Sequence, residues 1–458
     1  MSQSSKTIWG YRHVILVVIW TLYIINYFDR IAVLTFLPYI QEDLELTTVQ
    51  IGWLGSIFFF GYSFAQPFAG YMADKIGPKK LMNVAIVVFT GITFLTGFVK
   101  DFWQFIALRI GLAIGEGQHF APAMRTIANW FPKEEKGRAS GFFSTTWAVA
   151  PAIVPILVTQ LAAIFFDGAW RPVFFVLAVP GVIGIWLLWR YIDDSPKQIY
   201  AKGRMSKSEY DLIVKSVDVD ASEHGKQYSS KIYLKDIQFY IYTISMFLMV
   251  GIWWGMSTWL STFLVKQHGL NLRTMGMYAS LPYVVAFFAM FFGGWMSDKL
   301  FHGKPKIVTM ISLIGCIPAF YLIGQVSKGE TNSLIFFLCM GGFFINLAWG
   351  MMYAFPSWRY PKEMVGRTIG VSNGFGQFGA FVFPVVAGYL VTTLPDNSLD
   401  FSSVFYFFSG AALIGTLFVG FLKQKMIEID DRDVAVEVKP VLQPAAIAAL
   451  AVEKSSDK

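Results

Sequence analysis

The stretch Gly70-Tyr-Met-Ala-Asp-Lys-Ile-Gly-Pro-Lys-Lys80 decides the fold, because a shorter copy of it returns in the second half of the chain. The copy reads Gly294-Trp-Met-Ser-Asp-Lys299, and its aspartate lies 298 − 74 = 224 residues after the first, close to half of the 458 residues. Each copy follows the second long apolar block of its half. A repeat of this length predicts two related structural units.

The apolar blocks around these stretches predict membrane-spanning helices. Only 15% of the residues are charged and 55% are hydrophobic, whereas a soluble domain carries roughly 25% charged residues. A helix needs about 20 apolar residues to cross a hydrocarbon core, where its backbone groups must be satisfied internally. We therefore expect an all-α polytopic membrane protein of twelve transmembrane helices in two six-helix halves, at 13–37, 50–72, 81–99, 103–124, 138–166, 171–191, 236–264, 273–297, 305–326, 332–356, 365–393 and 402–423.

A polar stretch rich in Lys, Ser and Asp separates the halves. It predicts an N-terminal six-helix bundle at 1–192, a linker at 193–235, a C-terminal six-helix bundle at 236–424 and a tail at 425–458. The even-numbered short connections carry twelve Lys and Arg residues and the odd-numbered ones carry five. The positive-inside rule then puts both termini and the linker in the cytoplasm.

Composition and motifs also exclude several classes of function. The net charge of +7 is confined to the short connections, so it gives no nucleic-acid-binding face. The two cysteines have no metal-ligand spacing, and the chain has no HExxH, GxSxG or Walker motif. We therefore expect no enzyme activity, no cofactor and no metal.

Ionisable residues inside the apolar blocks are the strongest functional signal, because a charge there costs ~2.5–3.5 kcal/mol on insertion scales. Asp29 and Arg30 are adjacent in the first span; Arg109 and Glu116 are seven apart in the fourth, so they share a helix face. Their estimated depths allow Asp29 to pair with Arg109. Arg30, rotated ~100° from Asp29, can face a cavity. Desolvation makes such pairs poor stabilisers, which favours a functional role over a structural one.

These four residues suggest a switch between a proton and a substrate. A carboxylate in a low dielectric can take up a proton near neutral pH, unless an arginine holds it ionised. Protonation of Asp29 and Glu116 frees Arg30 and Arg109, and the planar guanidinium fork can then bind an incoming carboxylate. Neutral polar and aromatic residues at helical spacing complete the candidate substrate site, which comprises Arg30, Tyr27, Tyr62, Arg109, Trp147, Trp254, Tyr353, Asn373 and Gln377.

The stretch from Gly70 to Lys80 resembles the signature loop of the major facilitator superfamily. Within that superfamily, the chain resembles the anion:cation symporter family of sugar-acid and organic-acid:proton symporters. The residues that carry this likeness are Tyr27-Phe-Asp29-Arg30, Tyr62, Arg109 to Glu116 and Asn373. The resemblance implies proton coupling through Asp29 and Glu116 and carboxylate binding by Arg30, with Arg109 as charge partner. Trp147 departs from the glutamine frequent in sugar-acid permeases, which favours a smaller or flatter acid. The signature loops more often hold helix ends and control a gate than touch substrate; the residues concerned are Gly70, Asp74, Lys75, Gly77, Lys79, Lys80 and Asp298.

The sequence thus predicts a monomeric secondary transporter in a bacterial inner membrane, whose partners are a small organic anion, protons and the lipid bilayer. Two alternatives stay open on the same scaffold. A drug/proton antiporter would carry paired glycines after the fifth-helix proline, and residues 144–155 lack them. A uniporter for organic anions would have the same cavity but no proton dependence.

Overall fold

The computed structural model describes residues 9–222, 227–395, 398–429 and 434–435. Apolar blocks form its long helices, and polar residues begin several of them: the Thr47 and Asp101 side chains accept hydrogen bonds from the backbone N–H of Gln50 and Gln104. The first half contains α1 (Tyr11–Asp43), α2 (Thr48–Ile76), α3 (Pro78–Thr96), α4 (Phe102–Gly117), α5 (Phe120–Trp130), α6 (Lys133–Ser144), α7 (Thr146–Phe165) and α8 (Arg171–Tyr191).

The second half repeats this pattern after the linker elements α9 (Pro196–Ala201), α10 (Lys207–Ser222) and α11 (Lys231–Lys235). It contains α12 (Ile237–Lys266), α13 (Leu272–Trp295) with the π-helical turn η1 (Met296–Leu300), α14 (Pro305–Ile323), α15 (Thr331–Leu347), α16 (Trp349–Arg359), α17 (Lys362–Leu390) and α18 (Ser402–Gly420). Two short antiparallel pairs join β1 (Gln227–Tyr228) to β4 (Val434–Ala435), with Gln227 opposite Ala435, and β2 (Thr392–Thr393) to β3 (Leu399–Asp400), with Thr392 opposite Asp400.

The predicted fold class is confirmed. Within the described residues, ten helical segments are long and apolar enough to cross a membrane. The other two predicted spans correspond to α2, whose apolar sequence is interrupted by cavity-facing residues such as Tyr62 and Gln66, and to α4 followed by α5. Together with these two, the described part of the chain contains twelve spans, six in each half.

Three predicted spans are interrupted rather than continuous. The fourth breaks at Gln118 and His119, between α4 and α5. Pro122 accounts for this break, because it cannot donate a hydrogen bond to the carbonyl of Gln118 and its ring crowds that carbonyl. The fifth is interrupted at Thr145 and the tenth at Ala348.

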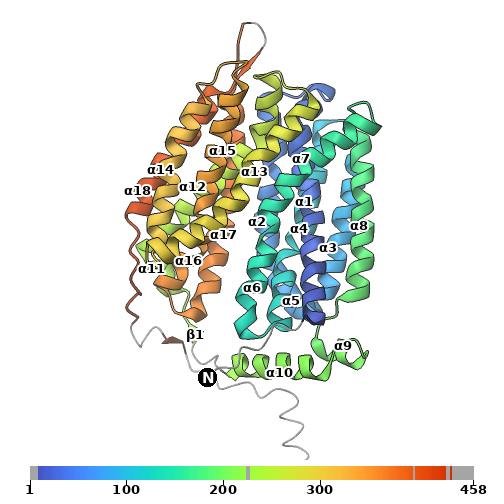
Figure 1. Ribbon diagram of the computed structural model, residues 1–458, viewed down its shortest axis with the longest axis vertical. Helices are drawn as coiled ribbons and strands as arrows, with labels where there is room; N and C mark the ends of the chain where they lie inside the picture. Colours follow the sequence, from blue (N-terminus) through green and yellow to red (C-terminus); the bar gives the residue numbers. More distant parts are fainter. Residues whose placement is uncertain (1–8, 223–226, 396–397, 430–433, 436–458) are drawn as a thin grey trace, which may run out of the picture.

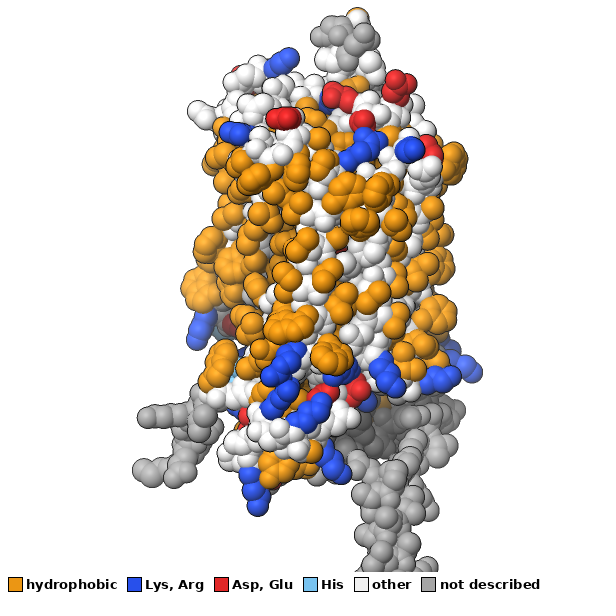
Figure 2. Space-filling view, turned by 90° about the vertical axis from the view of Figure 1, so that its right-hand side faces the viewer, with side chains coloured by type: hydrophobic (Ala, Val, Ile, Leu, Met, Phe, Trp, Pro, Cys, Tyr) orange, Lys and Arg blue, Asp and Glu red, His pale blue; other side chains and the backbone are white. Residues whose placement is uncertain are grey.

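The two halves stand side by side, with α12, α14, α17 and α18 on one side and α1, α3, α4 and α8 on the other (Figure 1). A band of exposed apolar side chains lies between two charged ends, and Lys and Arg gather at the end that carries the linker (Figure 2). This band is the surface expected against lipid. Helix α2 packs against α17, and α13 packs against α7, across the boundary between the halves.

The end of the bundle opposite the linker is closed. There the Trp259 indole N–H donates to the carbonyl of Pro384 over 3.0 Å, and Lys266 pairs with Glu42 at 2.5 Å between α12 and α1. A Cβ added at Gly52 would lie 2.6 Å from the Pro384 carbonyl oxygen, so only glycine permits this close approach of α2 to α17.

The predicted division of the chain at 192/193, 235/236 and 424/425 stays a prediction, although α8 ends at Tyr191 and α12 begins at Ile237. The linker contains more regular structure than its polar composition suggested, since α9, α10 and α11 lie within it. Most of the predicted tail lies outside the described residues.

Candidate substrate cavity and its buried charges

A cavity of about 1020 Å³ lies between the two halves. Its lining extends from Arg30 in α1 to Tyr233 in the linker helix α11 and Arg367 near the start of α17. Because the opposite end is closed, the cavity gives access from the linker end. Volumes of this order are typical of small-molecule sites.

Arg30 is the charged group deep in this cavity. Its guanidinium carbon lies 4.6 Å from the ring centre of Tyr27, 4.4 Å from that of Phe58 and 5.0 Å from that of Tyr62. Trp254 lies 5.8 Å away on the side of the second half. Such ring faces stabilise a desolvated cation without neutralising it, so Arg30 remains able to bind an anion.

Glu116 is the partner of Arg30. Nε and Nη2 of Arg30 both donate to Oε2 of Glu116, at 3.2 Å and 2.6 Å, and the two side chains are 3% and 0% exposed. Within the described residues, Oε1 of Glu116 has no hydrogen-bond partner. Arg30 lines the cavity and Glu116 does not, so the pair joins the cavity wall to the interior of the first half.

The expected pairing of Asp29 with Arg109 is not formed. Arg109 donates from Nε to the carbonyl of Leu54 over 3.3 Å, and its Nη1 and Nη2 have no partner among the described residues. Asp29 lies next to the Thr93 hydroxyl of α3. The predicted depths of the four charged residues along their helix axes agree with their common region in the structure. Depth does not give the rotation of a helix about its axis, and this rotation determines which residues pair.

Arg109 is also not on the cavity wall, contrary to its place among the candidate substrate-binding residues. It lies 1% exposed behind Phe58, whose ring centre is 5.1 Å from its guanidinium carbon and 4.4 Å from that of Arg30. Phe58 therefore lies against both arginines, and the sequence analysis missed it. Asp29 is buried away from the cavity as well.

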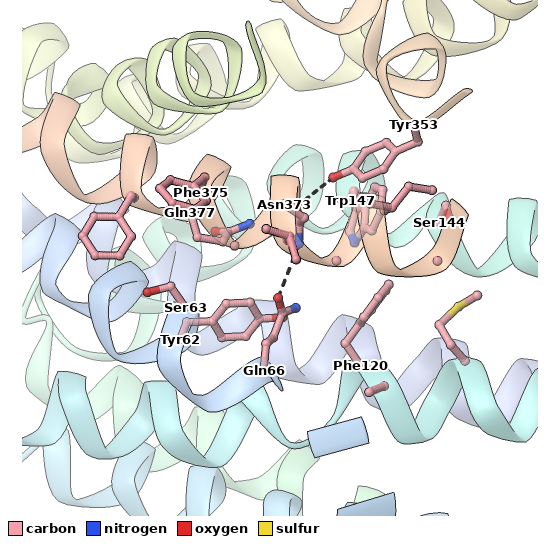
Figure 3. A pocket seen from close by; sticks show the side chains of 18 of the residues that line it. Tyr62, Ser63, Gln66, Phe120, Ser144, Trp147, Tyr353, Asn373, Phe375 and Gln377 are labelled. Atoms are coloured by element: carbon pink, nitrogen blue, oxygen red, sulfur yellow. Dashed lines mark hydrogen bonds between the residues drawn. The ribbon is translucent and has the colours of Figure 1, made fainter. Parts of the chain in front are cut away.

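A chain of hydrogen bonds crosses the cavity (Figure 3). The Tyr353 hydroxyl donates to Oδ1 of Asn373 (3.1 Å), Nδ2 of Asn373 donates to Oε1 of Gln66 (3.3 Å), and Nε2 of Gln66 donates to the Tyr62 hydroxyl (3.0 Å). Tyr62 and Gln66 belong to α2, whereas Tyr353 and Asn373 belong to the second half. These hydrogen bonds therefore link the two halves inside the cavity.

The other predicted substrate-site residues are brought together as expected. Tyr27, Tyr62, Trp147, Trp254, Tyr353, Asn373 and Gln377 all line the cavity. Further aromatic residues, including Phe120, Trp253 and Trp349, line it without having been singled out. Aromatic residues are frequent throughout this sequence, so composition alone could not mark these three.

The signature loop lies at the linker end, away from the cavity. Gly77 takes a φ of 88°, which favours glycine, and ends α2 with its N–H bonded to the Ala73 carbonyl over 3.1 Å. Lys79 bonds Asp193 through Nζ (2.7 Å) and Asp194 through its backbone N–H (2.7 Å). Lys75 and Lys80 are exposed, as is Asp298 in η1. Gly70 and Asp74 belong to α2, but the Asp74 side chain lies outside the described part of the chain.

Burial raises the pKa of the Asp193 carboxyl, but hydrogen bonds from Lys202 (2.5 Å) and Lys79 outweigh this and hold the pKa below its ordinary value. Asp193 thus stays ionised and ties the start of the linker to the signature loop. Lys79 was predicted from the sequence as a gating residue, but its partner Asp193 was not.

Two further anchors at the linker end were also missed. Glu209 of α10 accepts hydrogen bonds from the backbone N–H groups of Tyr11 and Arg12, both at 3.0 Å, and so caps α1 from outside the helix. Arg12 also binds Glu135 of α6, with Nε to Oε2 at 2.9 Å. In the second half, Asp236 caps α12 and binds Arg359 at 2.8 Å and 3.0 Å.

A second internal repeat lies next to these anchors in the sequence. Phe131-Pro-Lys-Glu134 followed by Gly137-Arg138 matches Tyr360-Pro-Lys-Glu363 followed by Gly366-Arg367. In the structure the first copy begins α6 and the second begins α17. Arg367 of the second copy reaches the cavity mouth.

The fold and this cavity define a membrane transporter: two six-helix halves enclose one central site that is accessible from one end of the bundle. Residues 19–340 match the family described as the Major Facilitator Superfamily, and the chain belongs to that family. It is a transporter and not an enzyme.

Curated relatives of similar length agree with this assignment. The probable sulfoacetate transporter SauU of Cupriavidus necator is 28% identical over 450 residues, covering 94% of this chain and 97% of that protein. The probable galactarate/D-glucarate transporter GarP of Escherichia coli is 28% identical, with 84% and 89% covered. The hexuronate transporter of Bacillus subtilis is 24% identical, with 86% and 91% covered.

Solved structures share the fold at lower sequence identity. A bacterial homologue of the human lysosomal transporter Spinster superposes with a TM-score of 0.68 at 18% identity, covering 92% of this chain and 96% of that one. The xylose transporter XylE of Escherichia coli gives 0.69 at 14% identity, with 90% and 98% covered.

Proposed function

We propose that this chain is a proton-coupled symporter that carries a small organic carboxylate by alternating access. The observation that carries the proposal is the buried bond between Arg30, on the cavity wall, and Glu116 behind it, 2.6 Å long. The similarity of this chain to relatives described as sulfoacetate, galactarate/D-glucarate and hexuronate transporters supports an organic acid as the substrate class.

The proposed step is an exchange of partners at Arg30. While Glu116 is ionised, it occupies Nε and Nη2 of Arg30. A proton on Glu116 removes its charge and with it the Coulomb attraction to Arg30, which weakens both bonds. A substrate carboxylate in the cavity then binds the released edge of the guanidinium. Release of the substrate lets Glu116 lose its proton and bind Arg30 again.

Asp29 is the second proton site in this proposal. It is buried in the same layer of the first half, next to Thr93, and it has no contact with the cavity. Its charge acts on Glu116 through the low-dielectric interior, where two nearby carboxylates disfavour each other's ionised form. Coupling thus needs no direct bond between Asp29 and an arginine.

The same proposal assigns an orientation. The excess of Lys and Arg at the linker end supports a cytoplasmic position for that end, for the linker and for both termini. The cavity would then face the cytoplasm. We propose a bacterial inner membrane as the location, a monomer as the transporting unit, and a gating role for the signature-loop residues.

Uptake by proteoliposomes tests the proposal. We expect a labelled organic acid to accumulate when an inward proton gradient is imposed, and the accumulation to disappear with a protonophore. Glu116→Gln should abolish accumulation while exchange of labelled for unlabelled acid continues. Glu428→Gln, at an exposed glutamate outside the bundle, is the matched control.

Three results would contradict symport. Unchanged accumulation in Glu116→Gln would remove the proposed proton site. Uptake that only equilibrates, and that a protonophore does not alter, would identify a uniporter. Acidification of the medium in exchange for a cationic drug would identify an antiporter.

A further inference from the structure

The wall of the cavity is dominated by aromatic side chains. They make up 13 of the 27 described residues that line it. The remaining described lining includes Arg30, with Arg367 at the mouth, and no carboxylate. The site therefore combines one deep positive charge with large apolar ring surfaces.

Several polar groups on this wall are bonded to one another or to their own helices, whereas the Gln377 amide and the Trp349 indole N–H have no hydrogen bond among the described residues. Tyr62, Gln66, Asn373 and Tyr353 form the hydrogen-bond chain across the cavity. The hydroxyls of Ser63 and Ser144 donate to carbonyls of their own helices, those of Phe60 (2.8 Å) and Ser140 (2.9 Å). A substrate with many hydroxyls would have to break these bonds or leave its own groups unpaired, and both are unfavourable in a desolvated site.

The rings form a continuous path away from Arg30. Tyr27 contacts Tyr23 (5.6 Å between ring centres), Tyr23 contacts Phe120 (6.0 Å), and Phe120 contacts Trp147 (6.1 Å). Trp147 in turn contacts Tyr353 of the other half at 6.1 Å, with a tilt of 38°. Phe120, Trp147 and Tyr353, here called the ring slot, come from α5, α7 and α16. They offer ring faces and edges from both halves to a flat ligand.

We propose that the substrate is an aromatic monocarboxylate, with its carboxylate on Arg30 and its ring in the ring slot. The inference rests on the proposed function of this cavity as an organic-anion site. An aromatic monocarboxylate suits this wall better than a sugar acid, which needs more free hydrogen-bond partners, and better than a dianion, which needs a second deep cation. A ring that lies against Trp147 and Tyr353 also contacts both halves at once, so the ligand itself helps to hold the halves together.

Calorimetric titration of the purified protein tests this inference. Phenylacetate is the aromatic probe, cyclohexanecarboxylate is an apolar but non-aromatic acid, and gluconate is a polyhydroxylated acid. We expect phenylacetate to bind at least about tenfold more tightly than gluconate, a difference of about 1.4 kcal/mol, and also more tightly than cyclohexanecarboxylate. Arg30→Ala should remove binding of all three.

Variants of Trp147 connect the preference to the ring slot. Trp147→Gln should weaken phenylacetate binding roughly two- to tenfold, the range measured for one aromatic pair, and leave gluconate binding equal or stronger. Trp147→Phe should retain the preference. Trp103→Gln, at an exposed tryptophan outside the cavity, is the matched control, and the melting temperature of each unliganded variant shows whether it is folded.

The outcomes separate this inference from the proposed function. If gluconate binds as tightly as phenylacetate, and Arg30→Ala abolishes both, the aromatic substrate is wrong and the organic-anion site survives. If acids bind equally to Arg30→Ala and to the unchanged protein, or if none of the three binds, both proposals are overturned. A preference that Trp147→Gln does not alter in a folded protein overturns the ring slot.

Discussion

The two halves share a fold but distribute their charges differently. In the membrane-spanning part of the first half, Asp29, Arg30, Arg109 and Glu116 are all at most 4% exposed. In the described part of the second half, Asp236 is the one buried Asp, Glu, Lys or Arg, and it lies outside the span, just before the first residue of α12. The second half instead contributes neutral groups such as Asn373 and Tyr353 to the cavity. The two halves thus share a scaffold, but the buried groups of the first are charged and those of the second are neutral. We therefore predict that mutations can alter proton coupling and substrate contact separately.

The largest effect is expected for Arg30→Ala. The substitution leaves Glu116 buried without its partner, and breaking a buried pair costs roughly 3–5 kcal/mol. We expect a strong loss of thermal stability together with loss of uptake. The double variant Arg30→Ala/Glu116→Ala should recover most of the stability and none of the uptake, as measured by thermal melting and proteoliposome transport. Recovery of uptake would show that the pair is merely structural.

Asp29→Asn should uncouple transport without blocking it. The amide removes a titratable group but preserves the size of the side chain next to Thr93. We expect proton-driven accumulation to fall at least about 10²-fold, the lower end of what loss of a proton-transfer group causes in enzymes, while substrate exchange is retained. Comparison of the two assays over pH 5–8 checks this. Unchanged accumulation would exclude Asp29 from coupling.

Asn373→Ala should have a smaller effect, and it should change KM rather than proton coupling. It removes both hydrogen bonds of Asn373, from the Tyr353 hydroxyl and to Gln66, and net contributions of ~1 kcal/mol each predict a rise of about thirtyfold in KM. Because no proton site is touched, the pH dependence of uptake should stay the same. A shifted pH profile would mean that the neutral half takes part in coupling after all.

The smallest effect is expected at the Asp236 anchor. Burial raises the pKa of Asp236, but bonds from Arg359, Tyr360 and the Gln238 backbone hold it below its ordinary value of 3.8. The folded pKa is therefore the lower one, so the carboxylate stabilises the protein above about pH 3.8, and this contribution is lost as the pH falls through the folded value.

Asp236→Asn should accordingly lower the melting temperature of this 458-residue chain at pH 7 by about 1 °C, for ~1 kcal/mol after allowance for solvent screening. The difference from the unchanged protein should shrink below pH 3.8. Asp211→Asn, at an exposed position of α10, serves as control. A pH-independent difference would show that the carboxylate charge does not stabilise this end of the bundle.

Periodicity and repeats predicted the fold well, because lipid leaves the backbone few choices. Eight of the nine residues predicted for the substrate site line the cavity, since polar groups four apart on an apolar helix must face the same interior. Tyr62 and Asn373 are examples.

The pairing of the charges could not be predicted, because it depends on rotation about the helix axis. Asp29 and Arg30 are sequence neighbours, but their side chains point in different directions, so Arg30 reached Glu116 and Asp29 lies beside Thr93. The contacts of the linker also escaped prediction. Glu209 reads as an ordinary surface glutamate in a polar helix until it is found capping α1.

The anchors of the linker limit how far the two halves can move apart. Helices α9 and α10 are bonded to the first half through Asp193 and Glu209, whereas Tyr228 accepts a hydrogen bond from Arg367 of the second half. Six peptide links, from Ser222 to Tyr228, join these two anchored parts. Since a chain extends at most ~3.3–3.6 Å per residue, the covalent length of this connection would act as a stop on the separation of the halves while both anchors hold. Lengthening the stretch with glycine and serine would show whether that stop governs the turnover rate.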